Sequence, residues 1–194
     1  MDKYKVLKKY FNYDKFRYPQ DLIIDSVIDG FDTIALLPTG FGKSVTFQVP
    51  ALMLEGLCIV ITPLIALMKD QVNNLKKRNI MAEYINSTQM LEEQNGVYKR
   101  ITNGKCKLLY VSAEKLQNEN FTNKIKKSNI SMVVIDEAHT ILWGEGFREA
   151  FLHISEFINK LNNKPRILAL TATATNKTSD KIIYYLILGL SKFK

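Results

Sequence analysis

The stretch Ile34-Ala-Leu-Leu-Pro-Thr-Gly-Phe-Gly-Lys-Ser44 decides the fold of this chain. Its apolar first part, residues 34–37, predicts a buried strand that Pro38 ends, and Lys43 opens a predicted helix. Backbone amides of a glycine loop between strand and helix bind anions, and a lysine adds a positive charge. We therefore predict a phosphate-binding loop formed by Pro38, Thr39, Gly40, Phe41, Gly42, Lys43, Ser44 and Val45.

A second apolar run, residues 132–135, decides between this interpretation and a generic turn before a surface lysine. The loop matches G-x-x-x-x-G-K-[ST] incompletely, because Leu37 stands where the first glycine belongs. The second run ends in two adjacent carboxylates, Asp136 and Glu137. In P-loop enzymes such an aspartate helps to hold magnesium. Together the two stretches predict a nucleoside triphosphatase core.

The predicted roles follow from the chemistry of these side chains. Lys43 would neutralise phosphate charge, and Ser44 and Asp136 would hold Mg²⁺. Glu137 would orient the attacking water, with a helix-start acid favoured by the helix dipole as the alternative.

Composition sets the outer limits. A chain of 194 residues, 46% hydrophobic and 24% charged, is typical of one globular domain. It has no apolar run near the ~20 residues that span a bilayer and no signal-peptide segment at its start, so we expect a cytoplasmic protein with no membrane partner. Two distant cysteines, Cys58 and Cys106, favour buried thiols over a disulfide or a metal site. The net charge of +8 suggests an anionic partner, although solvated lysines explain it equally well.

Strands and helices alternate along the chain. We expect strands at 33–37, 57–62, 81–85, 108–112, 131–135 and 167–170, with helices at 2–11, 19–29, 43–55, 63–78, 88–102, 120–127, 147–161 and 176–188. This order predicts an α/β fold with a mostly parallel sheet and helices on both faces. Ligands of such sheets bind at the carboxyl ends of the strands, where all the polar groups noted above would lie.

Several segments resemble the motifs of superfamily 2 helicases, and specifically the RecQ family of DNA helicases. Residues 38–44 resemble motif I, 62–72 motif Ia, 109–116 motif Ib, 136–139 motif II and 169–174 motif III. The long segment 62–72 is the most family-specific of these. In motif Ib, Ala113 and Lys115 replace the usual proline and arginine.

The resemblance implies a RecA-like P-loop domain that binds ATP, Mg²⁺ and DNA, single-stranded and at duplex junctions. The segment Phe16-Arg-Tyr-Pro-Gln20 resembles the adenine-recognition motif, which would make Gln20 and Arg17 adenine contacts and Tyr13 a stacking residue. His139 would link the ATP site to motif III, where Thr171 and Thr173 would relay the state of the γ-phosphate. The alternatives are that Tyr13 is a core aromatic, that His139 is a core histidine, and that Thr171 and Thr173 only cap the end of a strand.

The resemblance also implies DNA contacts at Pro63, Leu64, Ser112, Glu114, Trp143, Phe147 and Arg148. The aromatic-rich loop around Trp143 departs from the family: one residue is missing after His139, and Glu145-Gly146 replaces His-Asp. These departures put the coupling between DNA binding and hydrolysis in question. The basic clusters 76–78 and 124–127 are interpreted as solvated helix ends in preference to DNA contacts.

Helicase motors of this family use two RecA-like lobes, and motifs IV to VI lie on the second. The resemblance makes residues 1–194 the first lobe, with residues 1–32 forming the adenine-motif helices and the second lobe absent. Two alternatives stay open: a superfamily 2 RNA helicase or remodeller, and a nucleotide- and nucleic-acid-binding module with little turnover.

Overall fold

The computed structural model describes residues 2–86, 88–142, 145–173 and 180–184, and within 141–148 its description is limited to the backbone. A single six-stranded sheet organises the described chain, in the order β1-β6-β5-β2-β4-β3. Every neighbouring pair is parallel, which confirms the expected architecture. The strands are β1 Thr33–Leu36, β2 Leu57–Ile61, β3 Ala82–Ile85, β4 Leu108–Val111, β5 Ile130–Ile135 and β6 Arg166–Thr171.

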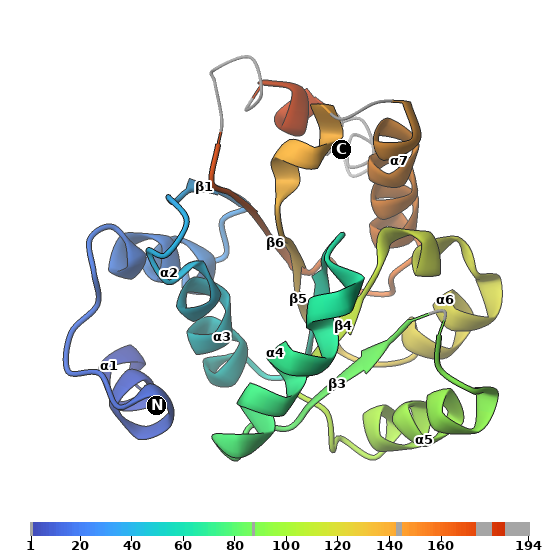
Figure 1. The fold of residues 1–194 in the computed structure, drawn as a ribbon, viewed down its shortest axis with the longest axis horizontal. Coiled ribbons are helices and arrows are strands. Elements are labelled where there is room, and N and C mark those ends of the chain that lie inside the picture. Colours follow the sequence, from blue (N-terminus) through green and yellow to red (C-terminus); the bar gives the residue numbers. More distant parts are fainter. Residues whose placement is uncertain (1, 87, 143–144, 174–179, 185–194) are drawn as a thin grey trace.

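Helices connect the strands and cover both faces of the sheet, with α1, α2 and α3 on the left of Figure 1 and α5, α6 and α7 on the right. The α-helices are α1 Lys3–Val6, α2 Gln20–Ile28, α3 Lys43–Met53, α4 Ile65–Lys77, α5 Leu91–Thr102, α6 Glu119–Ile125 and α7 Glu145–Asn159. A π-helical turn, Leu7–Phe11, and two 3₁₀ turns, Ala113–Gln117 and Ala138–Leu142, complete the set. The expected helix 176–188 lies largely outside the described residues.

Two hydrophobic cores result, one on each face of the sheet. In β2 the side chains alternate: Ile59 packs with α5, α6 and α7, and Val60 packs with α1 to α4. All five residues of β2 are buried, as expected for a central parallel strand. Cys58 and Cys106 are buried free thiols, as the sequence predicted.

Helix α2 buries one of its faces and exposes the other. The buried positions of α2 are Gln20, Ile23, Ile24 and Val27, which follow helical spacing. The same spacing turns Leu22 outward, where it is 54% exposed.

The parallel strands bring their carboxyl ends to one edge of the sheet. β1, β6 and β5 are adjacent, and they lead into the loop at 37–42, Thr171 and Asp136 respectively. Among the described residues, no helix is long and apolar enough to cross a bilayer.

Candidate nucleotide site and nucleic-acid contacts

The glycine loop joins β1 to α3 as predicted. The Leu37 amide donates to the Thr171 carbonyl over 2.9 Å, which ties the start of the loop to β6. Gly40 and Gly42 have φ of +81° and +76°, a left-handed region that suits glycine. Lys43 begins α3 directly after Gly42. The first amides of a helix have no acceptor within it, so this turn can receive an anion.

Lys43 meets the second strand's acidic pair at the mouth of this loop. Its Nζ lies 2.6 Å from Glu137 Oε1, although the two residues are 94 positions apart in the chain. The two side chains are only 14% and 21% exposed. Glu137 has a φ of +51°, in the left-handed region, which is uncommon for a residue other than glycine. This pairing joins the phosphate loop to β5.

Asp136 lies beside this ion pair. Its backbone amide donates to the Ile61 carbonyl over 2.9 Å, which places it at the end of β5 next to β2. Burial raises the pKa of Asp136 to about 6, and the neighbouring Glu137 charge adds to the rise while Lys43 opposes it. Its Oδ1 accepts from the Glu137 amide over 3.0 Å. A bound cation would stabilise this carboxylate in its ionised form.

The donor set fits Mg²⁺ bound together with a triphosphate. No group of three or more His, Cys, Asp or Glu side chains suited to a metal occurs within the described part of the chain. Mg²⁺ in nucleotide sites uses one or two protein oxygens and completes its shell with phosphates and water. Asp136 and the Ser44 hydroxyl, in the first turn of α3, are such donors.

His139 connects the acidic pair to β6. Its Nδ1 lies 3.1 Å from Thr171 Oγ1 and 3.4 Å from Glu137 Oε2. The Thr171 hydroxyl donates to the Thr173 carbonyl over 3.0 Å, so its lone pairs are available to an Nδ1–H donor. A continuous series of contacts therefore runs from Lys43 through Glu137 and His139 to Thr171.

Gln20 is engaged by the loop itself, which the sequence did not indicate. Its Nε2 donates to the carbonyls of Phe41 and Gly42 over 2.8 Å and 3.2 Å, and its Oε1 accepts from the Arg17 amide over 2.9 Å. The side chain of Arg17 donates to the Gly40 carbonyl over 3.3 Å. The side-chain amide of Gln20 therefore stabilises the phosphate loop. Its Oε1 has one further lone pair, which is the part of this amide that can still contact a base.

Tyr13 and Ser44 line one hollow of about 510 Å³, together with Phe11, Val45 and Gln48. Tyr13 is 52% exposed, so its ring is accessible to a ligand. Its stacking on adenine stays a prediction.

The residues expected to contact DNA differ in their exposure, and not all of them lie within the described part of the chain. Leu64 is 42% exposed, and its amide donates to Thr62 Oγ1, so it lies in a turn before α4, which begins two residues after Pro63. Ser112 is buried and Glu114 exposed, at a short 3₁₀ turn. Trp143 lies outside the described residues, while Phe147 and Arg148 are described only as backbone positions of α7.

Comparison with known proteins decides the family. The family model for DEAD/DEAH box helicases matches residues 17–182. The chain belongs to the DEAD/DEAH box helicase family. Within that family it is 42% identical, over 182 residues, to the ATP-dependent DNA helicase RecQ of Haemophilus influenzae, which confirms the RecQ resemblance. The match covers 93% of this chain and 29% of that relative's length.

Solved structures of other helicases share the fold of this family member. The DUF1998 helicase MrfA, bound to DNA and AMPPNP, superposes with a TM-score of 0.76 at 17% identity, over 94% of this chain and 28% of that one. The DEAD-box helicase Mss116, bound to ssRNA and UDP-BeF, gives a TM-score of 0.76 at 18% identity, over 96% and 41%. These likenesses confirm the RecA-like helicase fold. Since one neighbour binds DNA and the other RNA, the fold does not choose between the two nucleic acids.

Proposed function

We propose that this chain is the nucleotide-binding motor domain of a RecQ-type ATP-dependent DNA helicase, which couples ATP hydrolysis to strand separation. The observation that carries the proposal is the contact of 2.6 Å between Lys43 and Glu137 at the phosphate loop. This contact joins a loop that can bind phosphates to two carboxylates, of which Asp136 can bind a metal and Glu137 can orient a water. The identity of 42% to a RecQ protein supports DNA over RNA as the substrate.

The residues divide the work at the triphosphate. Lys43 would leave Glu137 for the β- and γ-phosphate oxygens, and the first amides of α3 would bind the same phosphates. Ser44 and Asp136 would hold Mg²⁺, which supplies further neutralisation of phosphate charge when bound. Arg17, Gln20 and Tyr13 would surround the adenine.

Release of Glu137 from Lys43 is the step that prepares hydrolysis. While the two are paired, the lysine ammonium occupies an oxygen of the carboxylate. Once the Lys43 ammonium binds the phosphates instead, the Glu137 carboxylate can orient the attacking water and accept a proton from it. His139 and Thr171 would pass the change at Glu137 to β6, and Thr173 would extend this relay toward a second lobe.

DNA would bind near the same edge, at the turns around Pro63 and Ser112, where backbone amides can contact phosphates without reading sequence. Glu114 lies in the second of these turns, and Leu64 in the first. Trp143, Phe147 and Arg148 remain the candidates for stacking on, or gripping, a single strand.

Titration with a fluorescent ATP analogue and Mg²⁺ tests the assignment. We expect Lys43→Ala to abolish binding, whereas Glu137→Gln retains it and loses hydrolysis in the full-length enzyme. Equal loss of binding in both variants would refute the separate roles. The DNA- and RNA-stimulated ATPase rates of the full-length protein would then choose between the two nucleic acids, and preferential stimulation by RNA would refute the DNA assignment.

The 194-residue chain by itself is expected to turn over slowly. Where a partner domain supplies an arginine finger, that arginine is typically worth about 10³- to 10⁵-fold in the rate of phosphoryl transfer. We expect weak Mg-ATP binding, poor hydrolysis and no unwinding, and strand separation by this chain alone would contradict that.

A further inference from the structure

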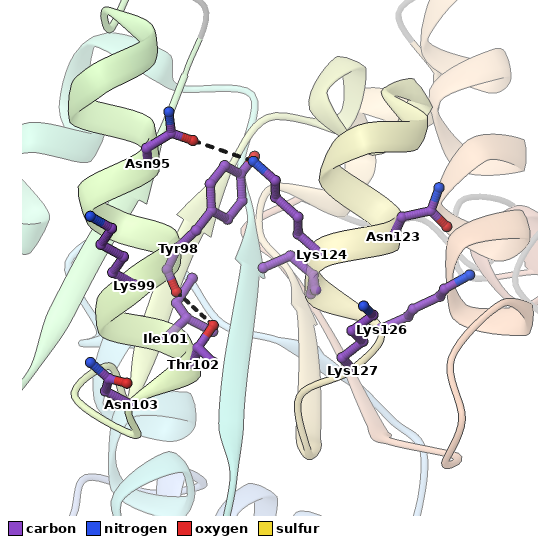
Figure 2. Close-up of a pocket in the computed structure, with 11 residues that line it drawn as sticks. Asn95, Tyr98, Lys99, Ile101, Thr102, Asn103, Asn123, Lys124, Lys126 and Lys127 are labelled. Carbon is purple, nitrogen blue, oxygen red and sulfur yellow. Dashed lines mark hydrogen bonds between the residues drawn. The ribbon is translucent and has the colours of Figure 1, made fainter.

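A basic groove lies at the opposite edge of the sheet from the nucleotide site. It is formed between the C-terminal halves of α5 and α6 and has a volume of about 840 Å³. Both helices end just before the strands β4 and β5 begin, so the groove lies at the amino edge. Figure 2 shows the two helices side by side, with Lys124 between them and Lys127 at the end of α6.

The groove's charge is uniform. Lys99 from α5 and Lys124, Lys126 and Lys127 from α6 and its end line it, and no Asp or Glu does. None of these four lysines forms an ion pair with a carboxylate among the described residues. The two helix C-termini each contribute roughly half a negative charge, which four lysines outweigh. The lysines therefore do more than complement two helix dipoles, and they leave a concave surface with a positive excess.

The aromatic ring in the groove is already covered. The Lys124 ammonium lies 4.3 Å from the centroid of the Tyr98 ring and 3.3 Å from Asn95 Oδ1, and Figure 2 shows it reaching across from α6. The same ring packs against Phe121, with centroids 6.4 Å apart. A nucleic-acid base would have to displace Lys124 in order to stack here. The groove thus lacks the open stacking surface of single-strand binding sites.

The remaining lining groups match a peptide. Asn103 and Asn123 each carry an amide with a donor and an acceptor, which is the pattern of a peptide group. Phosphates are acceptors only, so they would leave the asparagine carbonyls unmatched.

We propose that the groove between α5 and α6 binds an acidic peptide segment of a protein partner, with its carboxylates at Lys99, Lys124 and Lys127 and its backbone at the asparagines. Because the groove is at the amino edge of the sheet, this binding is independent of nucleotide. It therefore stands or falls separately from the proposed helicase function.

Fluorescence anisotropy with a labelled peptide of aspartate and serine residues, added to the 194-residue chain, tests this proposal. The test variant is Lys99→Glu/Lys127→Glu, which changes one exposed lysine on each wall. The matched control, Lys5→Glu/Lys15→Glu, changes the net charge equally at exposed positions near the N-terminus. Circular dichroism confirms that each variant is folded.

We expect the groove variant to bind the peptide about tenfold more weakly or worse. Each charge reversal removes a surface ion pair with the peptide and adds a repulsion of similar size. The control should lose less than about twofold, and Mg-ATP should leave the peptide's affinity unchanged. Absence of binding, or equal losses in both variants, would overturn the proposal. A larger loss of single-stranded or duplex DNA affinity than of peptide affinity in the groove variant would also overturn it, since it would assign the groove to nucleic acid.

Discussion

Replacing Asp136 by Asn should stabilise the unliganded protein at neutral pH. Burial and the adjacent Glu137 raise the pKa of Asp136 from 3.8 to about 6, so folding disfavours its ionised form. Each tenfold change in proton affinity is worth about 1.4 kcal/mol, and the rise from 3.8 to about 6 therefore corresponds to about 3 kcal/mol. Asn keeps an oxygen that can accept from the Glu137 amide, so the substitution removes the charge and preserves that hydrogen bond.

The effect has a defined pH dependence. Well below pH 3.8 the carboxyl is protonated in both states, so the substitution gains nothing. As pH rises from 4 to 6, the unfolded chain releases this proton before the folded chain does, and the native protein loses stability. Well above pH 6 the carboxyl is ionised in both states and the penalty is constant. The stability advantage of Asp136→Asn should therefore grow between pH 4 and 6 and level off at about 2–3 kcal/mol.

Urea unfolding followed by circular dichroism, at several pH values from 4 to 8, measures this advantage. The control is Asp70→Asn, at an exposed position of α4, which should change stability by less than about 0.5 kcal/mol at every pH. An Asp136→Asn protein less stable than the native chain at pH 7.5, or one whose advantage does not vary with pH, would refute the reasoning. The same variant should lose Mg²⁺-dependent nucleotide binding, which would identify the buried charge as one kept for function.

Three further predictions concern the loop, the relay and the thiols. Gly42→Ala should destabilise the protein more than Gly40→Ala in urea unfolding. Both positions have positive φ, which costs an alanine about 1–2 kcal/mol, but only at Gly42 would the new Cβ lie 2.8 Å from Gln20 Nε2. Equal losses of stability in the two variants would contradict this. Thr171→Val should lower stability by about 1–2 kcal/mol in thermal melts, because it removes the hydroxyl that His139 contacts. Thr171→Ser keeps a hydroxyl and should recover most of this loss. An unchanged stability of Thr171→Val would count against the contact. The two cysteine thiols, whose pKa burial raises, should react with DTNB only after urea unfolding, and rapid reaction in native buffer would disprove their burial.

Local sequence signals predicted much of the fold. The apolar run before Pro38, the glycines after it and the run that ends at Asp136 each act within a few residues, so strand, loop and carboxylate appear where expected. Gln20 shows the limit of such signals. The family resemblance implied an adenine contact at Gln20, but no local signal indicated that α2 also buries this side chain against the loop carbonyls of Phe41 and Gly42.

The contact between Lys43 and Glu137 could be anticipated only as a shared edge of the sheet. Its direct form depends on strand order, since β6 alone separates β1 from β5. The order of parallel strands is set by how whole crossover units pack, and neither stretch of sequence encodes it locally. The same reason explains why the basic cluster 124–127 looked like an ordinary helix end, because the groove exists only once α5 lies beside α6.

A crystal structure with Mg²⁺ and a non-hydrolysable ATP analogue tests the central claim most directly, because it shows which atoms surround the triphosphate. We predict that Lys43 Nζ leaves Glu137 and lies within hydrogen-bonding distance of a phosphate oxygen, with the metal bound by Ser44 and Asp136. A triphosphate bound elsewhere, with Lys43 still paired to Glu137, would contradict the account.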